Sequence, residues 1–164
     1  MCLNDLLINV VGTILGGILL TVILFLLNEY VFKKKNLSGE WIAVIKIQET
    51  KYNPFKNLSV EYKIHLLQKG YEILGSGEKI KDIKPDGSQT IFKREKRVII
   101  EIDGYFERKY FGSSIIYLNL NEEGRQRKTR ATYTLTLQDK KNMIGTFAST
   151  AADAKGKVNM KKVW

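Results

Sequence analysis

The longest apolar run of the chain lies between Leu6 and Leu27, where 22 residues pass without a charged side chain. Only an asparagine and two threonines interrupt it with polar groups. A helix rises about 1.5 Å per residue, so roughly 20 mostly apolar residues cross a hydrocarbon core about 30 Å thick. The pattern therefore predicts that residues 1–35 form a transmembrane anchor.

The charges on either side of this run predict its orientation. The preceding residues carry Asp5 and no Lys or Arg, whereas Lys33, Lys34 and Lys35 follow the run. A secretory signal peptide instead begins with positive charge, has a shorter apolar stretch and ends in a small-residue cleavage site. Because positive flanks mark the cytoplasmic side, we expect a single-pass protein of the cell inner membrane, with its N-terminus outside and residues 36–164 in the cytoplasm.

The remaining stretch of about 130 residues, long enough for one domain, alternates apolar and polar positions with a period of two. This period is typical of half-buried strands. The predicted strands are EWIAVIKIQ, LSVEYKIHLLQ, YEILGSGEKI, KRVIIEIDG, YFERKYF, SIIYLNLN, TRATYTLTLQ, NMIGTFAST and KVNMKKVW. Eight or nine short strands at close spacing predict an all-β domain, a meander that closes into a small antiparallel barrel of about eight strands or folds as a sandwich.

Two segments, 65–78 and 135–149, read as copies of one hairpin. Each has an apolar residue and a glutamine before a tight polar turn, then an apolar pair and a glycine. The glycines, Gly75 and Gly145, fit a kink or a close backbone approach in a curved sheet. The repetition favours an up-and-down barrel over a Greek-key sandwich, although any two amphipathic hairpins share part of this pattern.

Charge and cysteine content narrow the choice of partner and compartment. Residues 36–164 hold 24 Lys and Arg against 15 Asp and Glu, a net charge of +9. Such an excess attracts nucleotides, nucleic acid or acidic lipid headgroups. A domain that lies against an anionic membrane leaflet can also be basic without binding any other anion. The single cysteine, Cys2, cannot form an internal disulfide, which agrees with a reducing compartment.

The most specific short motif opens the first strand, as Leu37-Ser38-Gly39-Glu40-Trp41. A Gly-x-Trp at this place resembles the lipocalin and avidin-like barrels, in which the tryptophan plugs the closed end. A large flat ring fills the taper of a small barrel, and glycine lets the backbone bend into the strand.

The order of parts resembles a family, the transmembrane β-barrel effectors of bacterial CBASS anti-phage systems. The resemblance rests on the membrane segment, the basic stretch after it, NLSGEW at 36–41 and the L-x-Q-x-G-x-x-I-x-G hairpin from Leu66 to Gly75. It implies an antiviral defence effector without cofactor or metal, whose barrel binds a cyclic di- or oligonucleotide second messenger. It also implies a homo-oligomer that disrupts the inner membrane and does not bind nucleic acid polymers.

The chain also departs from that family, which typically has two membrane helices where this chain has one apolar run. The identity of the cyclic nucleotide, and whether it activates or restrains the effector, therefore stay open.

A cyclic nucleotide needs Lys or Arg for its phosphates and aromatic faces for its bases. The strands between 97 and 133 interleave the two, and alternation turns Tyr62 and Tyr133 inward and Arg130 outward unless a bulge intervenes. The candidate ligand-binding residues are Tyr62, Tyr105, Arg108, Tyr117, Arg130 and Tyr133, with Tyr110 in the same stretch. Each tyrosine also fits ordinary strand packing.

The apolar run contains a Gly-x-x-x-Gly pattern at Gly12 and Gly16. Small residues on one helix face let two helices pack closely, and Asn9, one turn earlier, can add an interhelical hydrogen bond. These residues predict self-association of the helix, although glycine is frequent in membrane helices generally.

A second basic site occupies residues 84–97, where Lys93, Arg94, Lys96 and Arg97 follow a Pro-Asp-Gly turn. It caps the pocket, touches lipid headgroups or is a solvated loop.

Catalysis has little support. The one histidine, His65, lies opposite apolar strand neighbours, and Cys2 is far from it in sequence, so there is no His/Cys cluster or Cys-His pair. The paired acids Glu122 and Glu123 are expected in a turn with Gly124. We therefore predict that the protein is not an enzyme. Besides the cyclic-nucleotide effector, two alternatives stay open: a membrane-tethered lipocalin-like carrier of an apolar ligand, and an interaction module with a filled barrel.

Overall fold

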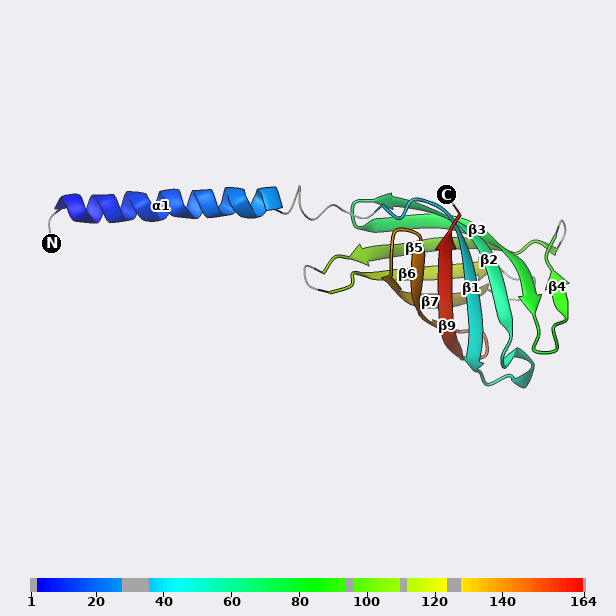
Figure 1. Cartoon of the computed structure of the whole chain (residues 1–164). Helices are drawn as coiled ribbons and strands as arrows, with labels where there is room; N and C mark the ends of the chain where they lie inside the picture. The colour runs from blue at the N-terminus through cyan, green and yellow to red at the C-terminus, as the bar shows by residue number, and fades with distance from the viewer. Residues whose placement is uncertain (1–2, 28–35, 94–95, 110–111, 124–127, 164) are drawn as a thin grey trace. The chain divides into compact units, whose positions relative to one another are not determined.

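The computed structural model describes residues 3–27, 36–93, 96–109, 112–123 and 128–163. The chain divides into two compact units, 1–35 and 36–164. Within the described residues, the first unit contains one α-helix and the second contains nine β-strands (Figure 1).

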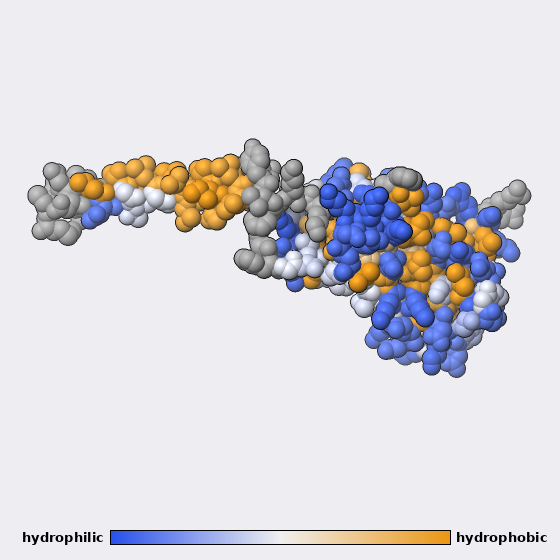
Figure 2. Space-filling view, in the orientation of Figure 1, coloured by the Kyte–Doolittle hydropathy of each residue, from blue (hydrophilic) through white to orange (hydrophobic). Residues whose placement is uncertain are grey.

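Helix α1 spans Leu3–Leu26. Its segment Ile8–Leu26 is 19 residues long and apolar enough to cross a membrane, and none of it is buried. Figure 2 shows the large apolar surface of this helix. A membrane anchor and a signal sequence near the N-terminus both have this length and composition.

The second unit is a closed barrel. Its strands are β1 (Gly39–Glu49), β2 (Ser59–Lys69), β3 (Glu72–Ile83), β4 (Gln89–Ile91), β5 (Ile99–Glu107), β6 (Ile115–Glu123), β7 (Lys128–Leu137), β8 (Asn142–Ser149) and β9 (Ala154–Lys162). Eight of these nine described strands pair antiparallel in a ring, β1-β2-β3-β5-β6-β7-β8-β9, and β9 pairs back with β1. The predicted eight-strand antiparallel barrel of lipocalin-like size is confirmed, and the sandwich is wrong.

Two strand boundaries differ from the sequence prediction. The stretches KRVIIEIDG and YFERKYF were expected as separate strands, but residues 99–107 form the single strand β5. Gly104 lies inside β5 opposite Leu118, where an added Cβ would overlap the carbonyl oxygen of Tyr117, so this glycine permits close strand approach and does not end the strand. The basic segment 84–97 contains the short strand β4, which folds back on the end of β3 after the expected Pro-Asp-Gly turn.

In both repeated hairpins, the glycine pairs with a leucine of the preceding strand. Gly75 pairs with Leu66 across β3 and β2, and Gly145 pairs with Leu135 across β8 and β7. An added Cβ on Gly75 would lie 2.5 Å from the carbonyl oxygen of His65, and one on Gly145 would overlap that of Thr134. The prediction of a close backbone approach at both glycines is confirmed.

One end of the barrel is filled and closed around Trp41, which is 0% exposed. Its indole Nε1 donates a hydrogen bond to the carbonyl oxygen of Leu37 at 2.8 Å, and the Leu37 amide donates to Oε1 of Gln68 at 2.8 Å. The chain enters the barrel at this end, with Leu37 itself buried. Apolar side chains complete the filled layer, among them Leu66, Ile73, Phe106, Ile116, Leu135, Met143 and Met160.

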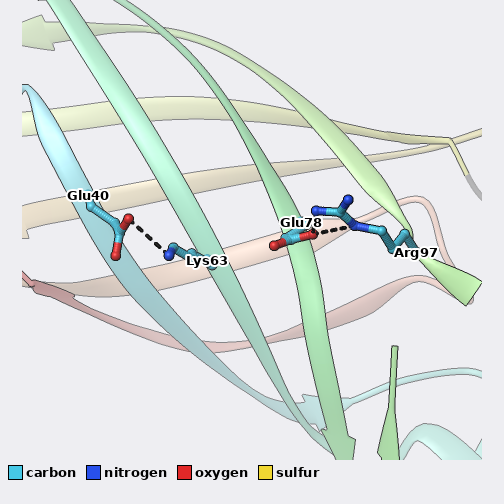
Figure 3. A network of polar contacts seen from close by, with 4 residues as sticks. All are labelled: Glu40, Lys63, Glu78 and Arg97. Atoms are coloured by element: carbon cyan, nitrogen blue, oxygen red, sulfur yellow. Dashed lines mark hydrogen bonds and ion pairs between the residues drawn. The ribbon is translucent and has the colours of Figure 1, made fainter. Parts of the chain in front are cut away.

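Ion pairs lie on the outer surface of the barrel (Figure 3). Lys63 on β2 lies 3.0 Å from Glu40 on β1, and Arg97, before β5, donates from Nε to Glu78 on β3 at 2.8 Å. Exposed pairs of this kind contribute about 0–1 kcal/mol each. The barrel is therefore held mainly by its buried apolar layer and by the closed ring of backbone hydrogen bonds.

Candidate functional site

The end of the barrel opposite Trp41 is hollow. It holds a cavity of about 500 Å³, within the range of small-ligand pockets in proteins, about 300–1,000 Å³. The inward positions near the strand ends build its apolar wall: Ile45, Ile47, Phe55, Leu58, Val60, Ile100, Leu120, Ala131, Phe147, Ala151 and Ala154.

Three polar side chains meet on one side of this cavity, and we call Tyr62, Glu122 and Tyr133 the polar pole. The Tyr62 hydroxyl donates to Oε2 of Glu122 at 3.0 Å, bridging β2 and β6 across the interior. Burial, together with the nearby Glu122 charge, raises the pKa of both tyrosines well above the ordinary value of 10.0. Both phenols are therefore neutral hydrogen-bonding groups at physiological pH.

A second polar pair, Lys79 and Asp82, lies on β3. Lys79 Nζ is 2.9 Å from Oδ1 of Asp82, and the ammonium also stands 4.6 Å from the ring centroid of Phe92. Burial raises the pKa of Asp82 despite the opposing charge of Lys79. The two charges compensate one another.

A bulge in β3 puts both members of this pair on the inner face. Val60 pairs with Asp82 and Tyr62 pairs with Lys79, so β3 has one residue more than β2 between these two pairs. The extra residue reverses the alternation of inward and outward side chains. Lys79 and Asp82 both line the cavity for this reason.

Among the described residues, the lining of this cavity carries little positive charge. The described part of the lining includes one cation, Lys79, and two carboxylates, Asp82 and Glu122. Many of the described lysines, such as Lys46, Lys63 and Lys157, are exposed at outward positions of the strands.

The structure brings two of the six candidate ligand residues to the cavity, Tyr62 and Tyr133. Tyr105 is 51% exposed and stacks on Tyr117 with ring centroids 4.8 Å apart, as a cross-strand pair on the outer face of β5 and β6. Arg130 is also exposed and alternates with the inward residues of β7. None of these three lines the cavity.

Arg108 follows β5 at the closed end of the barrel, so it too is far from the cavity. Tyr110 lies outside the described residues. The candidate residues that the structure describes therefore do not surround one pocket, because alternation and strand direction separate them.

The helix residues proposed for self-association are solvent-exposed in the isolated chain. Asn9, Gly12 and Gly16 are exposed, and an added Cβ on either glycine would meet nothing within 4 Å outside the helix itself. The Thr13 hydroxyl donates to the Asn9 carbonyl oxygen at 2.8 Å. This glycine face is open to a second helix.

Sequence reasoning missed the three charged residues in the described lining of the cavity. Glu122 was expected in a turn, but it is part of β6 and continues the inward alternation of Leu118 and Leu120, which was the available signal. Lys79 follows the alternation of Gly75 and Gly77 in the same way. Asp82 had no signal, because the bulge becomes visible only in the pairing of β2 with β3.

The described residues offer little for metal or nucleophilic chemistry. His65 is exposed on the outer face of β2. Within the described ranges, no three His, Cys, Asp or Glu side chains gather in a way that would hold a metal ion. The described lining of the cavity offers hydrogen-bonding groups and apolar surface.

Similarity to known proteins was found only at the level of the solved structures' folds. No family model matches the chain, and no curated protein sequence matches it. Among solved structures, a redesigned β-barrel, mFAP1, bound to DFHBI is similar at 12% identity with a TM-score of 0.48, over 77% of this chain and 94% of that chain. A second redesigned β-barrel is similar at 11% identity with a TM-score of 0.47, over 78% of this chain and 91% of that chain.

Proposed function

We propose that this protein is a membrane-anchored receptor whose barrel takes a small ligand through its open end. The observation that carries the proposal is the cavity of about 500 Å³ with an apolar wall and a polar pole. Ligand pockets are typically apolar with a few placed polar groups that fix orientation. An interaction module with a filled barrel would not need such a hollow.

The ligand that suits the cavity best has a flat or apolar body without negative charge. Aliphatic and aromatic side chains form most of the wall, and a phosphate inside would meet the carboxylates of Glu122 and Asp82. Like charges repel strongly where water is excluded. This favours the carrier or receptor of a ligand without negative charge over a receptor that encloses a polyanion.

A cyclic di- or oligonucleotide effector is the second candidate, with a base in the cavity and the phosphates outside it. The net charge of +9 on residues 36–164 supports it. So do exposed cations on the strand ends and loops at the open end, namely Lys56, Lys84, Lys128, Arg130 and Lys155. In this candidate the barrel is cytoplasmic, and the bound nucleotide controls self-association of α1 in antiviral defence.

The test of the receptor uses a blocked cavity and a matched control. Ala131 lines the cavity, so Ala131→Trp fills it, whereas Thr132→Trp places the same ring on the outer face of β7. The full chain in phosphatidylcholine nanodiscs is screened by thermal melting against naphthalene-2-carboxamide and against a panel of cyclic dinucleotides. A ligand at 100 times its Kd stabilises the folded state by about 2.7 kcal/mol.

We expect one of the two ligand classes to raise the melting temperature of the wild type and of Thr132→Trp, but not that of Ala131→Trp. Stabilisation by the carboxamide supports the first candidate, and stabilisation by a cyclic dinucleotide supports the second. An unchanged melting temperature with every compound, and also with the naphthalene-2-carboxamidine and nucleosides described below, would overturn the receptor proposal.

Self-association of α1 has its own test. Replacing Gly12 and Gly16 together by leucine is expected to abolish helix dimerisation, because two bulky side chains prevent close helix approach. Energy transfer between labelled full-length chains in liposomes measures it. Ile14→Leu with Ile18→Leu, on the opposite helix face, is the matched control, and energy transfer that persists in the glycine double variant contradicts the predicted contact.

A further inference from the structure

We infer that the polar pole formed by Glu122, Tyr62 and Tyr133 selects a flat ligand group with two adjacent N–H donors. Amidinium, guanidinium and the donor edge of guanine share this chemistry. The inference rests on the proposed receptor function and specifies which ligands its cavity accepts.

The charge of Glu122 has no cationic partner among the described residues. Lys79 is paired with Asp82, with Nζ 2.9 Å from Oδ1. Within the described part of the chain, the Glu122 side chain has one hydrogen bond, from the Tyr62 hydroxyl to Oε2. An ionised carboxylate has two oxygens and about four acceptor sites, so Glu122 retains most of its capacity to accept hydrogen bonds.

Tyr133 supplies a second observation that points to a ligand. Its side chain is 1% exposed and lines the cavity, yet its hydroxyl makes no hydrogen bond to any described residue. Buried tyrosine hydroxyls usually have a partner. A ligand at the polar pole would provide one, and the hydroxyl can both donate and accept.

The walls beside the polar pole suit a planar group. The Phe147 ring packs edge-on against the Tyr133 ring, with centroids 6.1 Å apart. Ile100 and Leu120 contribute apolar surface to the same cavity. A flat ring bound in the cavity would contact these side chains while its N–H edge meets the carboxylate.

The geometry and charge of the Glu122 carboxylate together favour a ligand group with two parallel N–H donors. Two parallel N–H groups match the two oxygens of a carboxylate, and charge-assisted pairs of this type are stronger and more directional than neutral ones. A carboxylate or phosphate at the same position has no donor to offer and is repelled by Glu122.

Three ligands with the same ring and different charge test the inference: naphthalene-2-carboxamidine, naphthalene-2-carboxamide and naphthalene-2-carboxylate. Binding to the full chain in phosphatidylcholine nanodiscs is measured by isothermal calorimetry at neutral pH. We expect the amidine to bind at least about tenfold more tightly than the amide, and the carboxylate to bind most weakly.

Glu122→Gln and Glu123→Gln form the matched pair of variants. Glu123 is the next residue along β6, is exposed, and pairs with Lys128 outside the cavity. Glu122→Gln should reduce the affinity of the amidine to that of the amide, whereas Glu123→Gln should leave the order of affinities unchanged. Thermal melting of each variant shows whether the barrel is folded.

Guanosine and inosine separate a nucleobase from a simple amidine, because inosine lacks the exocyclic amino group that completes the donor pair. Tighter binding of guanosine, lost in Glu122→Gln, identifies a guanine-type ligand. Amidine selectivity without discrimination between the two nucleosides identifies a non-nucleoside cation.

The inference and the receptor proposal fail differently. A carboxylate that binds as tightly as the amidine, or amidine selectivity that survives in folded Glu122→Gln, overturns the assignment of the polar pole while the cavity still binds ligands. Absence of binding by all three naphthalene compounds and both nucleosides overturns the inference, and if the cyclic dinucleotides also fail to bind, the receptor proposal fails with it.

Discussion

Replacing Trp41 by alanine is expected to lower the free energy of unfolding of the barrel by about 3–5 kcal/mol. The side chain is 0% exposed and fills the closed end. Its Nε1 also holds the carbonyl oxygen of Leu37 at 2.8 Å, where the chain enters the barrel. Removing the ring leaves a cavity beside strands β1 and β9 and an unpaired carbonyl group. Both effects lower the free energy of unfolding.

Urea unfolding of the full chain, followed by circular dichroism, measures this loss. Trp41→Phe is the informative partner, since it keeps much of the apolar contact and removes only the hydrogen bond. We expect it to cost about 1–3 kcal/mol. A loss under about 1 kcal/mol in Trp41→Ala would contradict the role of this residue as the plug of the barrel.

The second large effect is expected at Gly145, where alanine should lower the free energy of unfolding by about 3 kcal/mol. An added Cβ would overlap the carbonyl oxygen of Thr134 and lie 2.8 Å from the Cα of Leu135. Both are backbone atoms of the paired strand β7, so no side-chain rotation relieves the clash. Strands β7 and β8 would have to separate locally and weaken their hydrogen bonds.

Ile144→Ala is the control for this prediction, because Ile144 is the neighbouring residue of β8 and is 43% exposed. The free energy of unfolding of Ile144→Ala is expected to fall by about 1 kcal/mol or less. Thermal melting of the two variants under the same conditions compares them. Equal stability of Gly145→Ala and the wild type would mean that β7 and β8 do not approach as closely as described.

The two ends of the barrel differ in what their side chains do. The closed end, around Trp41 and Leu37, supplies packing. The open end contains the polar pole and the Lys79–Asp82 pair in a largely apolar wall. Substitutions at the first end should therefore change stability most, and substitutions at the second should change ligand affinity most.

Local alternation was enough to orient several side chains. The inward placement of Tyr62 and Tyr133 and the outward placement of Arg130 follow from the period of two that a pleated strand imposes. The plug at Trp41 follows from a motif at the start of the first strand. The same reasoning indicated the close approach at Gly145, since glycine in a strand marks a kink or a tight backbone contact.

Alternation could not reveal which inward residues share a layer of the barrel. Tyr105 and Tyr117 stack together, but on the outer face, and Arg108 belongs to the closed end. Distance along the barrel axis depends on strand pairing and register, which link residues far apart in sequence. Proximity in the chain therefore does not place these residues around the cavity.

The sequence by itself determined the apolar helix, the strand-rich domain and the tryptophan plug, because each depends on the local period or composition of a short segment. Only the tertiary structure decided what the cavity contains. Glu122 comes within 3.0 Å of Tyr62 through ring closure, although 60 residues separate them in the chain. Asp82 turns inward through a bulge that exists only in the register of β2 with β3.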